Sequence, residues 1–189
     1  MPDLISRTLA VLRENGVQLA EGLTPAEFDE LEDTFGFRFA PDHRALLEQA
    51  LPVNSRWTDW RGDVSAIRRR FEWPVEGIVF DVLENGFWPG SWGTKPADAF
   101  DVEAVARREL ARWPRLVPLY GHRYIAADHK DWIHPSPVFS VYQTDVMVYG
   151  CSLFEYARNE TSQSQFEVSH PVTYVPYWSD LAEGVEPNH

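Results

Sequence analysis

The pattern of apolar residues changes along the chain, and this change constrains the fold more than any other feature of the sequence. Up to about residue 115, apolar residues recur at helical spacing, as Phe28, Leu31 and Phe35 do at i, i+3 and i+7. Short runs rich in Val, Tyr, Phe and Ile then predict strands, and these runs cover 116–120, 124–127, 138–142 and 146–149. Helices followed by an antiparallel meander predict an α+β fold, in which one sheet with helices on one face buries the core.

Local signals place the helix boundaries. Thr24, followed by a proline and three residues later by Glu27, has the signature of a capped helix start, and Gly36 is typical of a helix end. Ser152 and Glu155 have the same capping-box spacing and predict a helix after the last strand. The other helices are expected at 4–12, 41–51, 64–73, 75–85 and 101–113, and the chain from 172 to 178 is expected to be extended.

Charge and composition argue against several classes of protein. Lys and Arg number 17 against 29 Asp and Glu, and the resulting net charge of −12 argues against binding to a nucleic-acid backbone. No apolar run approaches the length of about 18 residues that a membrane-spanning helix needs. The first residues include Asp3, Arg7, Arg13 and Glu14, which are foreign to a signal peptide, and a single cysteine leaves no disulfide framework. We therefore expect a soluble cytoplasmic protein with one domain over 1–189.

Three segments together resemble a known family. They are 22–27 with 35–42, then 116–121 with 125–128, and finally 137–141 with Asp145 and 152–156. In this order they resemble the SUKH superfamily of Smi/Knr-type proteins, from about residue 22 to residue 156. The resemblance implies a twisted antiparallel sheet with flanking helices. It also implies a function in protein contacts without catalysis, because many bacterial members resemble immunity proteins that neutralise a toxin, often a nuclease.

Two parts of the chain depart from the small members of that family. The first is a Trp-rich insertion at about 55–115, and the second is an extended C-terminal tail after about residue 160. A function special to this chain is expected in these additions.

A group of His and Asp residues supports an alternative, enzymatic hypothesis. His122, Asp128, His129, Asp131 and His134 lie close together in the sequence, and imidazole and carboxylate groups are metal ligands. A small metal-dependent or hydrolytic enzyme that uses the 122–134 loop is therefore the alternative. The competing interpretation is a polar turn between strands, because Asp is a common turn residue and the spacing of His129 and His134 does not place both on one helix face. We favour the turn, and predict neither a metal site nor a cofactor.

Cys151 is the one further candidate for catalysis. A thiol just before a helix is favoured as a nucleophile, because the helix N-terminus lowers a thiol pKa. No nucleophile signature surrounds this residue, and a small buried cysteine is the commoner case. We therefore predict no catalytic residue.

Five tryptophans concentrate within 36 positions of the inserted segment, at 57, 60, 73, 88 and 92. Trp is a core residue as well as a frequent anchor of protein interfaces. Phe87, Trp88 and Trp92 lie in a loop with Gly and Pro, where large side chains are harder to bury. We predict that these three residues contact a partner protein or a second copy of the chain. The expected function is a non-enzymatic protein-binding module, with a toxin as its expected partner.

Overall fold

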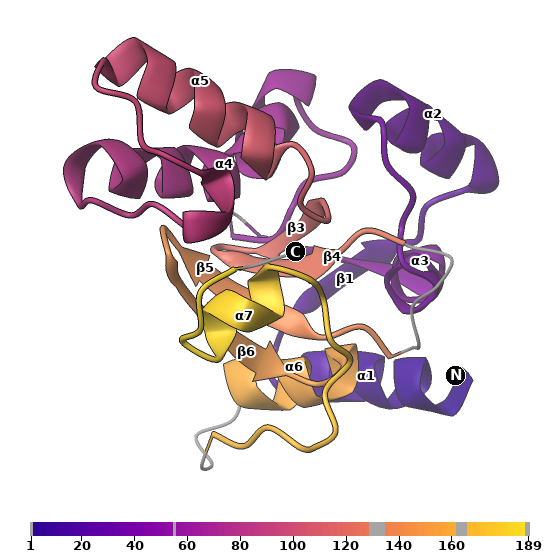
Figure 1. Ribbon diagram of the computed structural model, residues 1–189. Helices are drawn as coiled ribbons and strands as arrows, with labels where there is room; N and C mark the ends of the chain where they lie inside the picture. Colours follow the sequence, from indigo (N-terminus) through magenta and orange to yellow (C-terminus); the bar gives the residue numbers. More distant parts are fainter. Residues whose placement is uncertain (1, 55, 129–134, 162–165, 188–189) are drawn as a thin grey trace.

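An antiparallel sheet of four strands runs through the middle of the computed structural model, which describes residues 2–54, 56–128, 135–161 and 166–187 (Figure 1). The strands lie in the order β3 (Leu116–Tyr120), β4 (Arg123–Ala126), β5 (Val138–Tyr142) and β6 (Asp145–Gly150). Each strand lies within one residue of the range predicted for it. The α+β fold with a mainly antiparallel sheet is confirmed.

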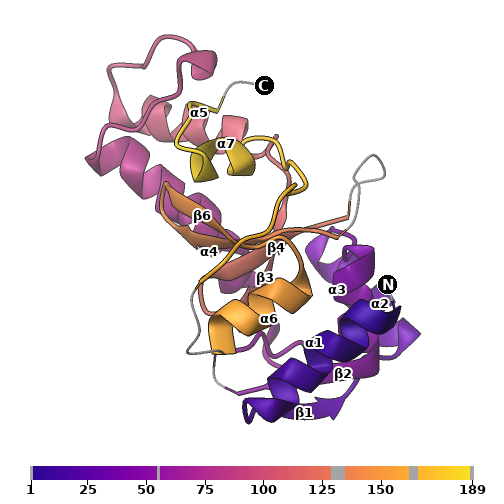
Figure 2. The same cartoon turned by 90° about the horizontal axis from the view of Figure 1, so that it is seen from below.

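Helices cover both faces of this sheet rather than the one face expected (Figures 1 and 2). Val117 and Val138 enter a first core cluster, whereas their neighbours Leu116 and Phe139 enter a second one. Since both alternating sets of strand residues are apolar, each face needs its own cover. The first cluster is covered by α1 (Pro2–Glu14), α2 (Pro25–Phe35), α3 (Pro41–Gln49) and α6 (Leu153–Thr161). The second is covered by the C-terminal half of α4 (Val64–Glu84), by α5 (Ala99–Leu110) and by α7 (Trp178–Ala182).

A second, two-stranded sheet pairs β1 (Gln18–Glu21) with β2 (Ala50–Val53). The helix predicted over 41–51 is wrong at its end, because α3 stops at Gln49 and the chain continues as β2. Ala50 and Leu51 are buried in the first cluster while their backbone pairs with β1. Directly after β1, the backbone at Gly22 lies very close to the end of α3, because a Cβ on Gly22 would be 2.1 Å from the carbonyl oxygen of Glu48.

The capped helix start at Thr24 is confirmed. The Glu27 amide donates to Thr24 Oγ1 at 3.3 Å, and the Thr24 amide donates to Glu27 Oε2 at 2.8 Å. At the start of α6, the Glu155 amide donates to Ser152 Oγ at 3.2 Å, but the Glu155 carboxylate accepts from the amide of Cys151 and not from that of Ser152. The capping-box spacing therefore predicts the start of α6 correctly, but not the hydrogen-bond partner of the Glu155 carboxylate.

α4 is one continuous helix, which corrects the two separate helices predicted at 64–73 and 75–85. Pro74 has no N–H to give to the carbonyl of Arg70, the bond that normally breaks at a proline inside a helix. The Tyr124 hydroxyl on β4 donates to this carbonyl at 3.0 Å instead. Because the sheet supplies the missing donor and the core buries the proline ring, the helix passes through Pro74.

The inserted segment and the C-terminal tail pack together in the second cluster, where the turn after α5 meets the start of α7. Trp113, just after α5, stacks on Tyr177 with ring centroids 4.9 Å apart and meets Trp178 edge-on at 5.1 Å. Trp178 Nε1 also donates to the Pro114 carbonyl at 2.7 Å. The chain predicted as extended over 172–178 forms no strand: it turns at 176–177, and α7 begins at Trp178. Both additions therefore help to close the second cluster.

Candidate protein-binding face

The five tryptophans between residues 57 and 92 differ in burial. Trp57 and Trp60 are buried in the first cluster, and Trp92, which ends the short helix η1 (Gly90–Trp92), is 9% exposed in the second. Trp88 is half-buried. Trp73 on α4 is 51% exposed, so it is the tryptophan of this segment with the most surface available to a partner.

The predicted binding loop at 87–93 packs largely on itself. The ring of Trp92 meets Phe87 at 6.0 Å and Trp88 at 5.3 Å, both nearly edge-on. Trp88 Nε1 donates to the Gly93 carbonyl at 2.8 Å, and the ammonium group of Lys95 lies 5.6 Å from the centre of the Trp88 ring. Phe87 and Trp88 are half-buried, whereas Trp92 has little surface exposed to solvent. Contact of these three residues with a partner stays a prediction.

A larger exposed aromatic group lies on α4 and on the hairpin of β5 and β6. Trp73, Phe80 and Tyr142 are 51%, 47% and 56% exposed, and we call these three residues the aromatic face. Trp73 and Phe80 are seven residues apart, so they lie on the same side of α4, about 10 Å from each other along its axis. Large aromatic side chains that are grouped and exposed are typical of contact surfaces.

The hairpin and the helix are fixed to each other at the centre of this face. A Cβ on Gly77 would lie 3.0 Å from Gln143 Cα, so the helix backbone approaches the hairpin turn as closely as only glycine allows. The buried carboxylate of Asp81 accepts from the Thr144 amide at 2.8 Å and from the Thr144 hydroxyl at 2.6 Å. These contacts hold Tyr142 beside α4 before any partner binds, which lowers the entropic cost of binding.

A small hollow of about 210 Å³ lies at the same place. It is lined by Trp73, Glu76, Gly77, Tyr142 and Gln143. Glu76 is already paired with Arg107 through two hydrogen bonds of 2.7 and 2.9 Å, and this pair lowers the pKa of Glu76. The hollow therefore offers aromatic walls and a fixed carboxylate, which suits an inserted side chain of a partner protein.

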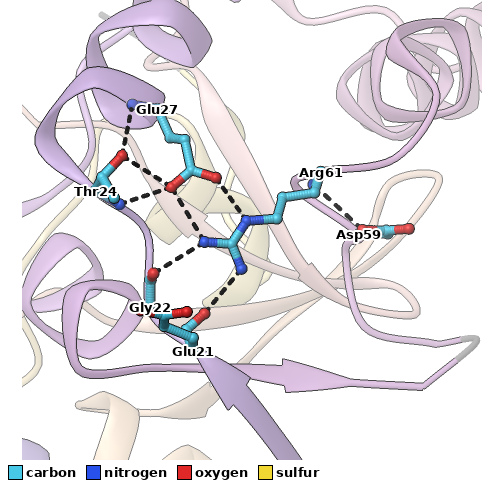
Figure 3. Close-up of polar contacts among 6 residues, drawn as sticks. All are labelled: Glu21, Gly22, Thr24, Glu27, Asp59 and Arg61. Atoms are coloured by element: carbon cyan, nitrogen blue, oxygen red, sulfur yellow. Dashed lines mark hydrogen bonds and ion pairs between the residues drawn. The ribbon is translucent and has the colours of Figure 1, made fainter.

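The polar network around Arg61 has a structural function (Figure 3). Arg61 Nε donates to Glu27 Oε1 at 2.6 Å, and its two terminal nitrogens donate to the carbonyls of Glu21 and Gly22 at 2.9 and 3.0 Å. Hydrogen bonds from Arg61 and Thr24 lower the pKa of Glu27 to about 2. Each nitrogen of the guanidinium group has at least one acceptor, so the network joins the loop before α4 to the start of α2.

Only some of the His and Asp residues of the enzymatic alternative lie within the described residues. His129, Asp131 and His134 lie outside them, while Asp128 is exposed and its amide donates to the Arg38 carbonyl at 2.8 Å. His122 is half-buried beside Arg123, and burial together with the nearby arginine charges lowers the pKa of His122. Within the described ranges, no group of three or more His, Cys, Asp or Glu side chains is placed to hold a metal ion.

Cys151 is poorly prepared to act as a nucleophile. Burial and the adjacent Glu155 carboxylate raise the pKa of its thiol. A raised pKa reduces the thiolate, which is the reactive form.

The aromatic face was not found from the sequence. The expected break between 73 and 75 hid the fact that Trp73 and Phe80 share one helix, outside the buried set that includes Phe71, Ile78 and Val82. A helical projection over the whole of 64–84 would have separated them from the core residues. No local signal brings Tyr142 to α4, because that contact depends on the tertiary approach at Gly77.

Comparisons with known proteins give no match: no family model fits the chain, and no curated protein or solved structure is similar enough to be matched. Among the described residues, no helix combines the length and the apolar character that a membrane crossing requires.

Proposed function

We propose that this chain is a non-enzymatic protein-binding module that docks on its partner through the aromatic face. The observation that carries the proposal is the group of three half-exposed aromatic residues, Trp73, Phe80 and Tyr142, on a helix and a hairpin that are fixed to each other. Rigid aromatic anchors lose little conformational entropy on binding and dominate the binding energy of many interfaces.

The net charge of −12 favours a basic partner. Opposite charges speed the encounter of two proteins, while two copies of this chain repel each other at long range. A basic toxin, such as a nuclease, fits this charge, and the resemblance to SUKH immunity proteins supports the same class of partner. We propose neutralisation of such a toxin in the cytoplasm as the finer form of this function.

The test is affinity capture from the source cell, with quantitative mass spectrometry of what is retained. The wild-type chain is compared with Trp73→Ala, Tyr142→Ala and the control Phe100→Ala, which removes a 79% exposed aromatic ring on α5. We expect a basic protein that is retained by the wild type and by Phe100→Ala and is lost from the other two variants. Equal retention by all four proteins would refute the aromatic face as the docking site.

A further inference from the structure

A cavity of about 470 Å³ lies where α4 and α5 meet the start of β3. Its apolar lining combines three aromatic side chains, Phe71, Trp113 and Trp178, with aliphatic residues and prolines. Trp113 and Trp178 are buried and meet edge-on at 5.1 Å. The cavity therefore has a fixed aromatic wall and a volume within the usual range for small-molecule sites.

Two arginines of the cavity have no carboxylate partner within the described ranges. Arg68 and Arg115 both line it, and neither forms an ion pair in the part of the chain that the structure describes. The guanidinium group of Arg115 lies over the Phe71 ring, 4.8 Å from its centre, and that of Arg68 lies over the Phe35 ring at 5.6 Å. Burial and the charge of Arg68 lower the pKa of Arg115, so the two cations are close enough to repel each other.

The other charged residues of the cavity differ from this pair. Arg107 donates to both carboxylate oxygens of Glu76 and, at 2.8 Å, to Glu103. Glu72 lines the cavity as well, and within the described residues it forms an ion pair with neither Arg68 nor Arg115. Arg68 and Arg115 are both exposed to solvent, and Arg115 Nη1 donates to the Gly36 carbonyl at 3.5 Å. Both guanidinium groups are therefore accessible to an anion that enters the cavity beside its aromatic side chains.

We propose that this cavity binds a small organic acid, with its carboxylate between Arg68 and Arg115 and its apolar body against Trp113 and Phe71. Guanidinium groups hold carboxylates through paired, charge-assisted hydrogen bonds, and the aromatic wall takes an aromatic or branched aliphatic body. The cavity shares only Glu76 with the hollow beside Tyr142, so the proposal does not depend on the protein-binding function.

Isothermal titration calorimetry of the full chain with phenylacetate tests this site. Phenylacetate has a carboxylate and one aromatic ring, and 2-phenylacetamide is its uncharged counterpart of the same shape. We expect saturable, one-to-one binding of phenylacetate with a dissociation constant in about the millimolar range, as befits so small a ligand. The amide should bind at least about tenfold more weakly, the factor that corresponds to one charge-assisted hydrogen bond.

Three variants locate the binding. Arg115→Gln and Arg68→Gln should each weaken phenylacetate binding by at least about tenfold. The matched control is Arg69→Gln, which removes the same charge from the next position of α4, outside the cavity, and should leave the affinity unchanged. A thermal melt of each variant verifies that it is folded. The proposal is overturned if phenylacetate shows no saturable binding, if the amide binds equally well, or if Arg69→Gln weakens binding as much as Arg115→Gln does.

Discussion

His43 on α3 is fully buried, and its imidazole lies edge-on to the rings of Phe39 and Trp60. Neither ring nitrogen has a hydrogen-bond partner among the residues that the structure describes. Burial lowers the pKa of His43 to about 3, from an ordinary value of 6.5, so the folded protein holds this side chain neutral over most of the pH range. The unfolded chain protonates it much earlier, and this difference ties stability to pH.

We predict that the free energy of unfolding falls as the pH is lowered from about 6.5 towards 3, because the unfolded state binds the His43 proton first. The contribution of this residue reaches at most about 1.4 kcal/mol per pH unit. Urea titrations at several pH values measure it. His43→Leu should flatten this part of the pH dependence, whereas the exposed control His170→Gln should keep it. Parallel pH dependences for wild type and His43→Leu would contradict the assignment.

Two tryptophans of the inserted segment should lose very different amounts of stability on truncation. Trp92→Ala removes a ring that is 9% exposed in the second cluster and should cost about 3–5 kcal/mol of unfolding free energy. Trp73→Ala removes a half-exposed ring and should cost less than about 1 kcal/mol. Denaturant unfolding of both variants provides the comparison, and a larger loss for Trp73→Ala would show that the aromatic face is part of the core.

Among the elements, α4 owes its continuity to a contact outside the helix. Pro74 leaves the Arg70 carbonyl without its helical donor, and the Tyr124 hydroxyl bonds that carbonyl at 3.0 Å. Tyr124→Phe should therefore destabilise the protein by about 1–3 kcal/mol, the cost of a buried carbonyl without a donor. Pro74→Ala restores an N–H at the normal position for this carbonyl.

The two changes should be coupled in a double-mutant cycle. In the Pro74→Ala background, Tyr124→Phe should cost at least about 0.5 kcal/mol less than in the wild type, because the helix then supplies the donor. Urea unfolding of the four proteins measures the coupling energy. Additive effects would mean that the hydroxyl does not compensate for the proline.

Local signals were sufficient for elements that their own residues define, and not for those that distant contacts define. The start of α2 needs only Thr24 and Glu27, and the strands of the main sheet consist of β-branched and aromatic runs. The first two residues of β2 were predicted as the end of a helix, because the pairing of β2 with β1 joins residues more than 25 positions apart, such as Leu19 and Pro52. The aromatic face could not be predicted for the same reason, since Tyr142 reaches α4 only through the close approach of the hairpin turn to Gly77.

At the scale of the whole molecule, the two core clusters share one sheet and one long helix. Leu116 and Val117 are consecutive residues of β3, yet they belong to different clusters. α4 joins them as well, with Phe71 in the first cluster and Val82 in the second. Loss of one cluster would expose a whole apolar face of the sheet and leave part of α4 without its packing.

We therefore predict that the chain unfolds in a single cooperative transition. Far-ultraviolet circular dichroism reports the helices and tryptophan fluorescence reports the packing around the indoles, and their urea midpoints should coincide. Leu9→Ala in the first cluster and Val82→Ala in the second should each shift both probes together to lower urea, with Leu9→Ala costing about 2–5 kcal/mol. Separate midpoints, or a variant that moves only one probe, would show that the clusters unfold independently. If the shifts coincide, the two clusters unfold together. A partner that binds the aromatic face at Phe80, on α4, would then stabilise both clusters, because α4 contributes residues to each.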